Sequence, residues 1–89
     1  MSCFVYLIKS KINQSFYVGI SDNPTRRLKE HNSGKLKTSS KLKPYVLVYT
    51  KEYKNYELAR KHEKWLKKKN KDYKEKLAQL APPEIGGVN

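Results

Sequence analysis

The chain has 89 residues, and its 20 Lys and Arg residues against 8 Asp and Glu residues give a formal net charge of +12. This length leaves room for one domain, and no run approaches the roughly 20 apolar residues of a membrane-spanning helix, which excludes a membrane-embedded class. A lysine-rich protein without a charged partner is one explanation of the charge. Nucleic acid is the better one, because contacts with phosphates release counterions and reward this charge density.

The cysteine and histidine content also excludes two kinds of structural cross-link. A single cysteine, Cys3, excludes an internal disulfide, and with two histidines there is no Cys/His set for a structural zinc ion. The amino terminus lacks the pattern of a secretory signal. We therefore expect an intracellular, cytoplasmic protein without a membrane partner.

The first predicted element is a β-hairpin. Apolar residues occupy both parities of residues 3–9, which is typical of a strand buried on both faces. A polar turn over residues 10–15 separates it from a second strand over residues 16–20. Gly19, inside this second strand, indicates a bend or a close approach to the backbone.

A helix, a basic loop and a third strand come next. Asn23 as N-cap, Pro24 as first helical residue and Gly34 as terminator predict a helix from Pro24 to about Asn32. Residues 35–43 carry four lysines and no acid, which favours a basic loop. Residues 45–50 then form a β-rich segment and predict the third strand.

Two helices complete the predicted domain, which spans residues 1–80. Asn55 caps a helix reaching about Lys69, whose predicted buried stripe is Leu58, His62, Trp65 and Leu66. A shorter helix follows, with Tyr73, Leu77 and Leu80 on one side. Residues 81–89 hold two prolines and two glycines and are expected to form a disordered tail. The order β-β-α-β-α-α predicts an α/β fold, a small three-stranded antiparallel or mixed sheet flanked by helices.

Four short segments of the chain resemble the GIY-YIG nucleases. Phe4-Val5-Tyr6 and, after ten intervening residues, Tyr17-Val18-Gly19 resemble the paired tripeptides that name that family. Residues 26–32 resemble its first helix, and residues 58–63 resemble the helix that carries its metal-binding glutamate. The similarity covers about residues 3–70 and is closest to the small free-standing, single-domain (UPF0213-like) members. It implies the GIY-YIG fold and a metal-dependent endonuclease that hydrolyses phosphodiester bonds in DNA, with a role in DNA repair or recombination.

The resemblance also assigns five catalytic side chains. It implies that Tyr6 helps to deprotonate the attacking water, that Tyr17 orients water or phosphate, and that Arg27 holds the scissile phosphate. It further implies that His31 accepts a proton and that Glu63 binds one Mg²⁺ or Mn²⁺ ion. A free phenol has a pKa near 10, so ionisation at neutral pH needs a shift of about three units, on the order of 4 kcal/mol. Arg27, lysines and a bound cation could supply part of that shift.

Each of these residues also has a purely structural explanation. The two tyrosines could be ordinary core residues, Arg27 a solvated charge and His31 a capping or surface residue. Glu63 could simply pair with Lys67 one helical turn away. The catalytic explanation requires the five side chains to lie close together in the fold, whereas the structural explanations do not.

Further residues are predicted to contact nucleic acid. Arg26 flanks the site, and residues 60–76 hold nine basic and three acidic side chains, which form either a groove for the phosphate backbone or a solvated face. Similarity to the small family members adds contacts in and before the basic loop. The complete predicted set is Arg26, Asn32, Lys35, Lys37, Thr38 and Lys67.

The sequence departs from the family pattern in three ways. Phe4 stands where the family has glycine, and Ile20 follows Gly19 where some relatives have a lysine, so the identity of the general base stays open. No DNA-recognition domain follows, so specificity is expected to be low or to come from a protein partner. Two alternatives remain: a non-catalytic nucleic-acid-binding module of the same fold, and a scaffold or toxin-like module. The sequence leaves the oligomeric state open.

Overall fold

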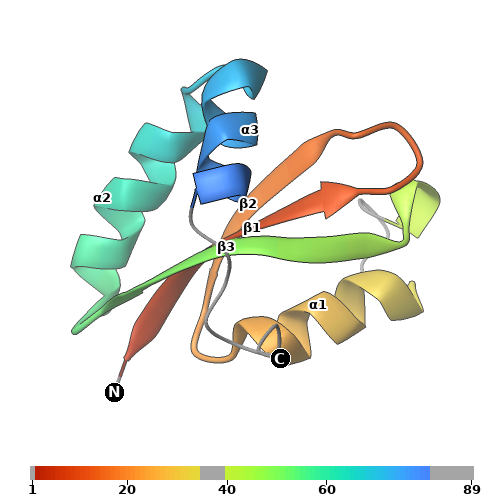
Figure 1. The fold of residues 1–89 in the computed structure, drawn as a ribbon. Helices are drawn as coiled ribbons and strands as arrows, with labels where there is room; N and C mark the ends of the chain where they lie inside the picture. The colour runs from red at the N-terminus through yellow and green to blue at the C-terminus, as the bar shows by residue number, and fades with distance from the viewer. Residues whose placement is uncertain (1, 35–39, 81–89) are drawn as a thin grey trace.

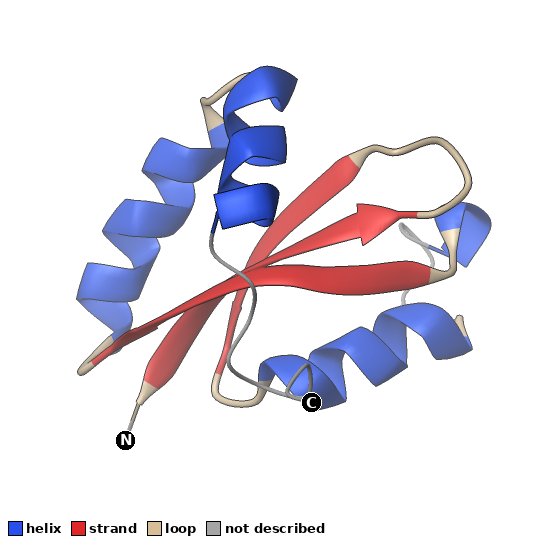
Figure 2. Cartoon of the chain, viewed as in Figure 1, coloured by secondary structure: helices blue, strands red, loops and turns tan. Residues whose placement is uncertain are grey.

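The computed structural model describes residues 2–34 and 40–80 and arranges them as one sheet between two helical layers (Figures 1 and 2). The predicted order β-β-α-β-α-α is confirmed. The one additional element, a short 3-10 helix, lies in the segment predicted as a loop. The elements are β1 (Cys3–Ser10), β2 (Phe16–Ser21), α1 (Pro24–Ser33), η1 (Ser40–Leu42), β3 (Tyr45–Tyr53), α2 (Tyr56–Lys67) and α3 (Lys71–Leu80). The predicted disordered tail, residues 81–89, lies outside the described residues.

The sheet is antiparallel throughout, with strand order β2-β1-β3. The central position of β1 explains its apolar residues at both parities. Val5 and Leu7 point to one face and Tyr6 and Ile8 to the other, and each is at most 1% exposed. In the β1–β2 register, Tyr6 lies directly opposite Gly19.

Different helices cover the two faces of the sheet. On one face α2 and α3 enclose an aliphatic core that includes Val5, Leu7 and Leu66. On the other face α1 lies against a cluster built on Tyr6, Ile8 and Tyr45. Burying one such apolar side chain contributes about 1.5–3 kcal/mol, so both clusters hold the sheet between its helices.

The predicted caps position α1. The Asn23 side chain accepts a hydrogen bond from the Arg26 amide, and Pro24 is the first helical residue. At the other end Gly34 adopts φ 83°, a left-handed conformation that suits glycine, and its N–H donates to the His31 carbonyl. The helix therefore has fixed ends, and its residues four apart share one face toward the sheet.

The predicted buried stripe of α2 is confirmed at Leu66 and wrong at Leu58 and Trp65. The buried residues of this helix are Ala59, Glu63 and Leu66, whereas Leu58 is 43% and Trp65 45% exposed. The small Ala59 lets the helix approach the sheet closely, and the bulky Trp65 is turned outward beside α3 instead. This rotation places an acidic residue, Glu63, in the interior.

No helix in the described part of the chain is both long and apolar enough to cross a membrane.

Candidate active site

Four aromatic rings meet on the α1 face of the sheet. Tyr6 from β1 and Tyr17 from β2 are stacked with ring centroids 6.4 Å apart, and His31 from α1 lies 4.7 Å from the Tyr17 ring. The Tyr6 hydroxyl and His31 Nε2 are 3.3 Å apart, at hydrogen-bonding distance. Tyr45 closes the group, with its ring 5.6 Å from that of His31. The structure therefore brings together three side chains that are widely separated in sequence and that the sequence marked as catalytic.

Gly19 makes room for the Tyr6 ring. A Cβ atom built on Gly19 would lie 2.5 Å from both Cζ and the hydroxyl oxygen of Tyr6, far inside van der Waals contact. The glycine of the Tyr17-Val18-Gly19 segment is thus explained by packing, because the phenol lies across the backbone of the neighbouring strand. This is the close approach that the sequence predicted at Gly19.

Arg27 reaches the same cluster from α1. Its guanidinium is held by Glu30 through an ion pair of 2.8 Å, and its side chain remains about one third exposed. Arg27 also acts on the Tyr6 phenol through hydrogen bonding and charge. The side chain thus connects the buried rings with solvent.

The environment of Tyr6 does not favour its ionisation. Burial raises the pKa of Tyr6, and the opposing hydrogen bond and positive charge from Arg27 do not offset it. The neighbouring Tyr17 and the carboxylate of Glu63 raise this pKa further. Arg27 lowers the pKa of Tyr6, as expected from the sequence, but the effect of desolvation is larger and of opposite sign. Tyr6 is therefore a neutral hydroxyl at pH 7.

His31 is shifted in the opposite sense. Burial lowers the pKa of its imidazole, and the positive charge of Arg27 lowers it further, while Glu30 partly opposes both. The ring is 0% exposed and is neutral at pH 7, with a nitrogen able to accept a proton. Of the two partners in the Tyr6–His31 contact, the imidazole is the base.

Glu63 is a buried carboxylate on the inner face of α2. It is 6% exposed, and its two oxygens contact Arg60 Nη1 at 2.8 Å and Lys67 Nζ at 3.3 Å. The helical pair with Lys67, which was the structural alternative for this residue, is therefore present. Glu63 nevertheless lies close enough to Tyr6 to raise the pKa of that phenol, although α1 and α2 cover different faces of the sheet.

Glu63 would offer a cation one carboxylate, whose two oxygens contact Arg60 and Lys67 in this structure. Within residues 2–34 and 40–80, no three His, Cys, Asp or Glu side chains are grouped closely enough to hold a metal ion. One carboxylate with a shell of waters is a known arrangement for Mg²⁺. Arg60 and Lys67 are each about half exposed, so both side chains reach solvent while they pair with Glu63.

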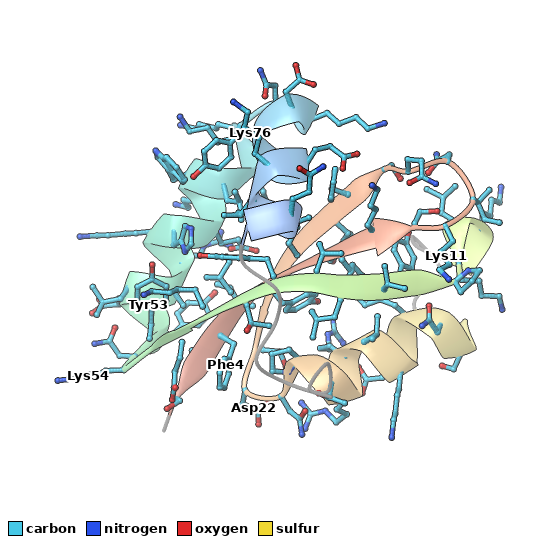
Figure 3. All side chains as sticks on the ribbon, viewed as in Figure 1. Phe4, Lys11, Asp22, Tyr53, Lys54 and Lys76 are labelled. Carbon is cyan, nitrogen blue, oxygen red and sulfur yellow. The ribbon has the colours of Figure 1, made fainter. Side chains whose placement is uncertain are left out.

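Of the residues predicted to contact phosphates, Arg26 lies at the surface and Asn32 has a structural role. Arg26 is exposed and pairs with Asp22 at 2.7 Å, near the start of α1 (Figure 3). Asn32 has another role, because its amide donates to the Tyr45 carbonyl at 3.0 Å and accepts from the Tyr45 N–H at 2.6 Å. It fixes α1 to β3, and we leave it out of the proposed interface. Lys35, Lys37 and Thr38 lie outside the described residues.

Sequence reasoning missed three residues that shape this site. Tyr45 adds the fourth ring, Arg60 holds the Glu63 carboxylate, and Glu30 holds Arg27. The two ion-pair partners each stand three positions from their partner on a helix, and this spacing could have identified them. Tyr45 carries no such signal, because its ring reaches His31 only through the pairing of β3 with β1.

The chain is similar to proteins of a known family. The model of the GIY-YIG family, described as a GIY-YIG catalytic domain, matches residues 2–77. The chain belongs to the GIY-YIG family. Membership indicates a nuclease family, and it confirms the predicted fold and the resemblance on which the candidate residues were chosen.

Relatives of this GIY-YIG chain include several UPF0213 proteins. A UPF0213 protein of Aeromonas salmonicida is 38% identical over 76 residues, covering 84% of this chain but 55% of the relative. One of Vibrio campbellii is 37% identical over 76 residues, with 84% and 72% covered. The solution NMR structure of a UPF0213 protein from Bacillus halodurans is 32% identical, with TM-score 0.56, 99% of this chain covered and 89% of the other. The chain thus spans about half the length of its Aeromonas relative.

Proposed function

We propose that this GIY-YIG protein is an endonuclease that hydrolyses phosphodiester bonds in DNA, with one Mg²⁺ or Mn²⁺ ion and low intrinsic sequence specificity. The observation that carries the proposal is the convergence of Tyr6, Tyr17, Arg27 and His31 on one face of the sheet, with a buried Glu63 carboxylate nearby. A core made only for stability does not need a buried phenol that interacts with both an imidazole and a guanidinium.

Arg27 is assigned to the scissile phosphate. Its planar group offers parallel N–H donors that match two phosphate oxygens, and it is partly exposed while its inner side faces Tyr6. Phosphate binding would place the arginine where negative charge grows as the bond to the attacking oxygen forms. The Glu30 carboxylate holds the guanidinium at this place before a substrate arrives.

Tyr6 and His31 are assigned to the proton of the attacking water. Because burial raises the pKa of Tyr6 and lowers that of His31, a tyrosinate base is unfavourable and a neutral imidazole is favoured. The phenol therefore takes the proton of water as it passes its own proton to His31 Nε2, 3.3 Å away. Tyr17 stacks on the Tyr6 ring, meets the His31 ring edge to face, and is assigned to orienting the water or the phosphate.

Glu63 is assigned to the metal ion. When bound there, the ion would act as a Lewis acid on the phosphate and stabilise the leaving oxygen. Arg60 and Lys67 would then bind flanking phosphates, and the net charge of +12 supports binding along the DNA backbone.

A non-catalytic nucleic-acid-binding module is the second candidate function. It is favoured by the two cations that already engage both oxygens of Glu63, and by Ile20, which replaces a possible activating lysine. Both functions predict DNA binding that weakens with salt. If four phosphates are contacted, log K falls with a slope of about −3.6 against log salt.

The experiment that decides between them is a cleavage screen. The purified protein is incubated with Mg²⁺, Mn²⁺ or EDTA and with single-stranded, nicked and branched DNA. We expect metal-dependent cutting that EDTA abolishes. Binding without cutting, across all metals and substrates, would establish the non-catalytic module instead.

Arg27→Ala is the variant to run beside this screen, with Arg26→Ala as the matched control. We expect Arg27→Ala to slow cleavage about 10²- to 10³-fold, because the transition-state contact is lost. Arg26 is an exposed neighbour paired with Asp22, so its loss should weaken binding only a few-fold. Equal effects of the two substitutions would contradict the role of Arg27.

A further inference from the structure

A second group of aromatic rings lies outside the catalytic cluster, along the outer side of α2. Tyr53, at the end of β3 beside α2 (Figure 3), contacts His62 with ring centroids 5.7 Å apart. His62 contacts Trp65 at 5.9 Å, and Trp65 contacts Tyr73 of α3 at 5.5 Å. These rings form a continuous row across β3, α2 and α3.

The far end of this row is open to solvent. Trp65 is 45% and Tyr73 36% exposed, although both are large aromatic residues. The Lys69 ammonium lies 4.4 Å from the centre of the Trp65 ring and 5.7 Å from that of Tyr73. We refer to Trp65, Lys69 and Tyr73 as the aromatic–lysine platform. It combines partly exposed aromatic rings with a cation held over them.

The surroundings of the platform are strongly basic. Residues 60–76 carry nine basic and three acidic side chains. Two of the three acids are already engaged, Glu63 with Arg60 and Lys67, and Glu75 with Lys9 at 2.9 Å. The exposed lysines of α2 and α3 thus give the surface a net positive charge.

Exposed aromatic rings surrounded by lysines fit single-stranded nucleic acid better than an apolar protein surface. An apolar protein surface would cover exposed aromatic rings, but the centres of protein–protein interfaces are depleted in lysine. Single-stranded nucleic acid matches both properties, because its bases stack on aromatic side chains while its phosphates contact the cations. Duplex DNA fits less well, since its bases are already stacked on one another.

We propose that the aromatic–lysine platform binds an unpaired base of single-stranded DNA. The inference rests on the proposed nuclease function for the identity of the strand, and it adds the substrate class. Blunt duplex DNA would contact only the basic surface.

Intrinsic fluorescence tests this proposal directly, because Trp65 is the only tryptophan of the chain. The full chain is titrated with an oligothymidylate in EDTA, so that no cutting occurs, while binding is followed separately by anisotropy of the labelled oligonucleotide. We expect quenching of Trp65 that parallels binding. Binding without any change in Trp65 fluorescence would overturn the proposal.

Substitutions supply the second measurement. Trp65→Ala should weaken binding of the oligothymidylate roughly 5- to 150-fold, the range for loss of one stacked base, and weaken binding of blunt duplex much less. Tyr56→Ala is the matched control, an exposed aromatic residue of the same helix that is 56% exposed. Equal affinities of wild type and Trp65→Ala, with unchanged melting temperatures, would overturn the proposal. So would a change of oligomeric state on Trp65→Ala without a change in DNA affinity, since the platform would then be a contact between copies.

These outcomes are distinguishable from failure of the proposed nuclease function. The fluorescence and anisotropy measurements are made without metal and do not depend on cleavage. Quenching without cleavage in the metal screen would support the platform and reject the nuclease. Cleavage without quenching would do the reverse.

Discussion

The two faces of the sheet are built from alternate residues of the same strand, yet their chemistry differs. Toward α2 and α3, β1 presents Val5 and Leu7, which pack into an aliphatic core with Leu66. Toward α1 it presents Tyr6, whose hydroxyl lies at hydrogen-bonding distance from the buried His31. Because successive side chains of a strand point to opposite faces, one strand can stabilise the fold on one side and carry reactive groups on the other.

Glu63 breaks this division of the two faces. It belongs to α2 and is buried beside the aliphatic core, where an unpaired carboxylate would be costly. Arg60 and Lys67 offset that cost. The carboxylate nevertheless acts on Tyr6 of the opposite face. We propose that Glu63 has a role shared with the other face.

The largest effect is expected from Glu63→Gln. The amide keeps the shape of the side chain but loses the charge that would hold a cation, so cleavage should fall about 10²- to 10³-fold. DNA binding should change little, since the carboxylate serves the cation and not the backbone. The measurements are cleavage rate and DNA affinity, with Glu57→Gln in the exposed first turn of α2 as control. Parallel loss of binding and cleavage would argue that Glu63 only maintains the helix.

A smaller effect is expected from Gly19→Ala. The added methyl group would meet the Tyr6 ring at 2.5 Å, so the phenol must move away from His31. We expect a loss of about 1–3 kcal/mol in the free energy of unfolding, together with slower cleavage. In a Tyr6→Leu background the ring is absent, and the cost of Gly19→Ala should shrink. Additive costs in the double variant would show that the two residues do not interact as described.

Much of the fold follows from local signals that act over a few residues. The caps Asn23 and Asn55 and the terminator Gly34 define helix ends through hydrogen bonds with neighbouring backbone, so their positions could be predicted. The orientation of α2 could not be predicted in the same way. The spacing of Leu58 and Trp65 fits an apolar stripe, but the helix buries the smaller Ala59 against the sheet instead.

The site shows the same limit. The segments around Tyr6, Tyr17, Arg27, His31 and Glu63 could be selected by resemblance to a family, and their proposed roles stay predictions. The protonation states could not be predicted, because they depend on burial that only the assembled fold creates. Arg27 was expected to supply part of a downward shift in the pKa of Tyr6, and desolvation outweighs its contribution.

The smallest expected effect is that of acid pH on the free energy of unfolding and on cleavage. Burial lowers the pKa of His31 and, on the other side of the sheet, of His62, relative to about 6.5 in an unfolded chain. The unfolded state therefore binds more protons than the folded state as pH falls through 6.5, and the free energy of unfolding decreases in acid. Denaturant titrations at pH 7.5 and pH 5 check this, and His31→Gln or His62→Gln should each reduce the dependence. Cleavage should lose activity on the acid side with an apparent pKa below 6.5, and only His31→Gln should remove this limb. Stability that rises on acidification would contradict the burial of both imidazoles.

The central claim is that Glu63 and the rings on the α1 face of the sheet serve one cation-dependent site. Titrating the ¹⁵N-labelled chain with Mn²⁺ tests it without any need for activity, because the paramagnetic ion broadens the NMR signals of nearby nuclei. The account predicts the steepest broadening at Glu63, followed by Gly19 and Tyr6, and its disappearance in Glu63→Gln. Broadening that is centred elsewhere, or that persists unchanged in Glu63→Gln, would contradict it.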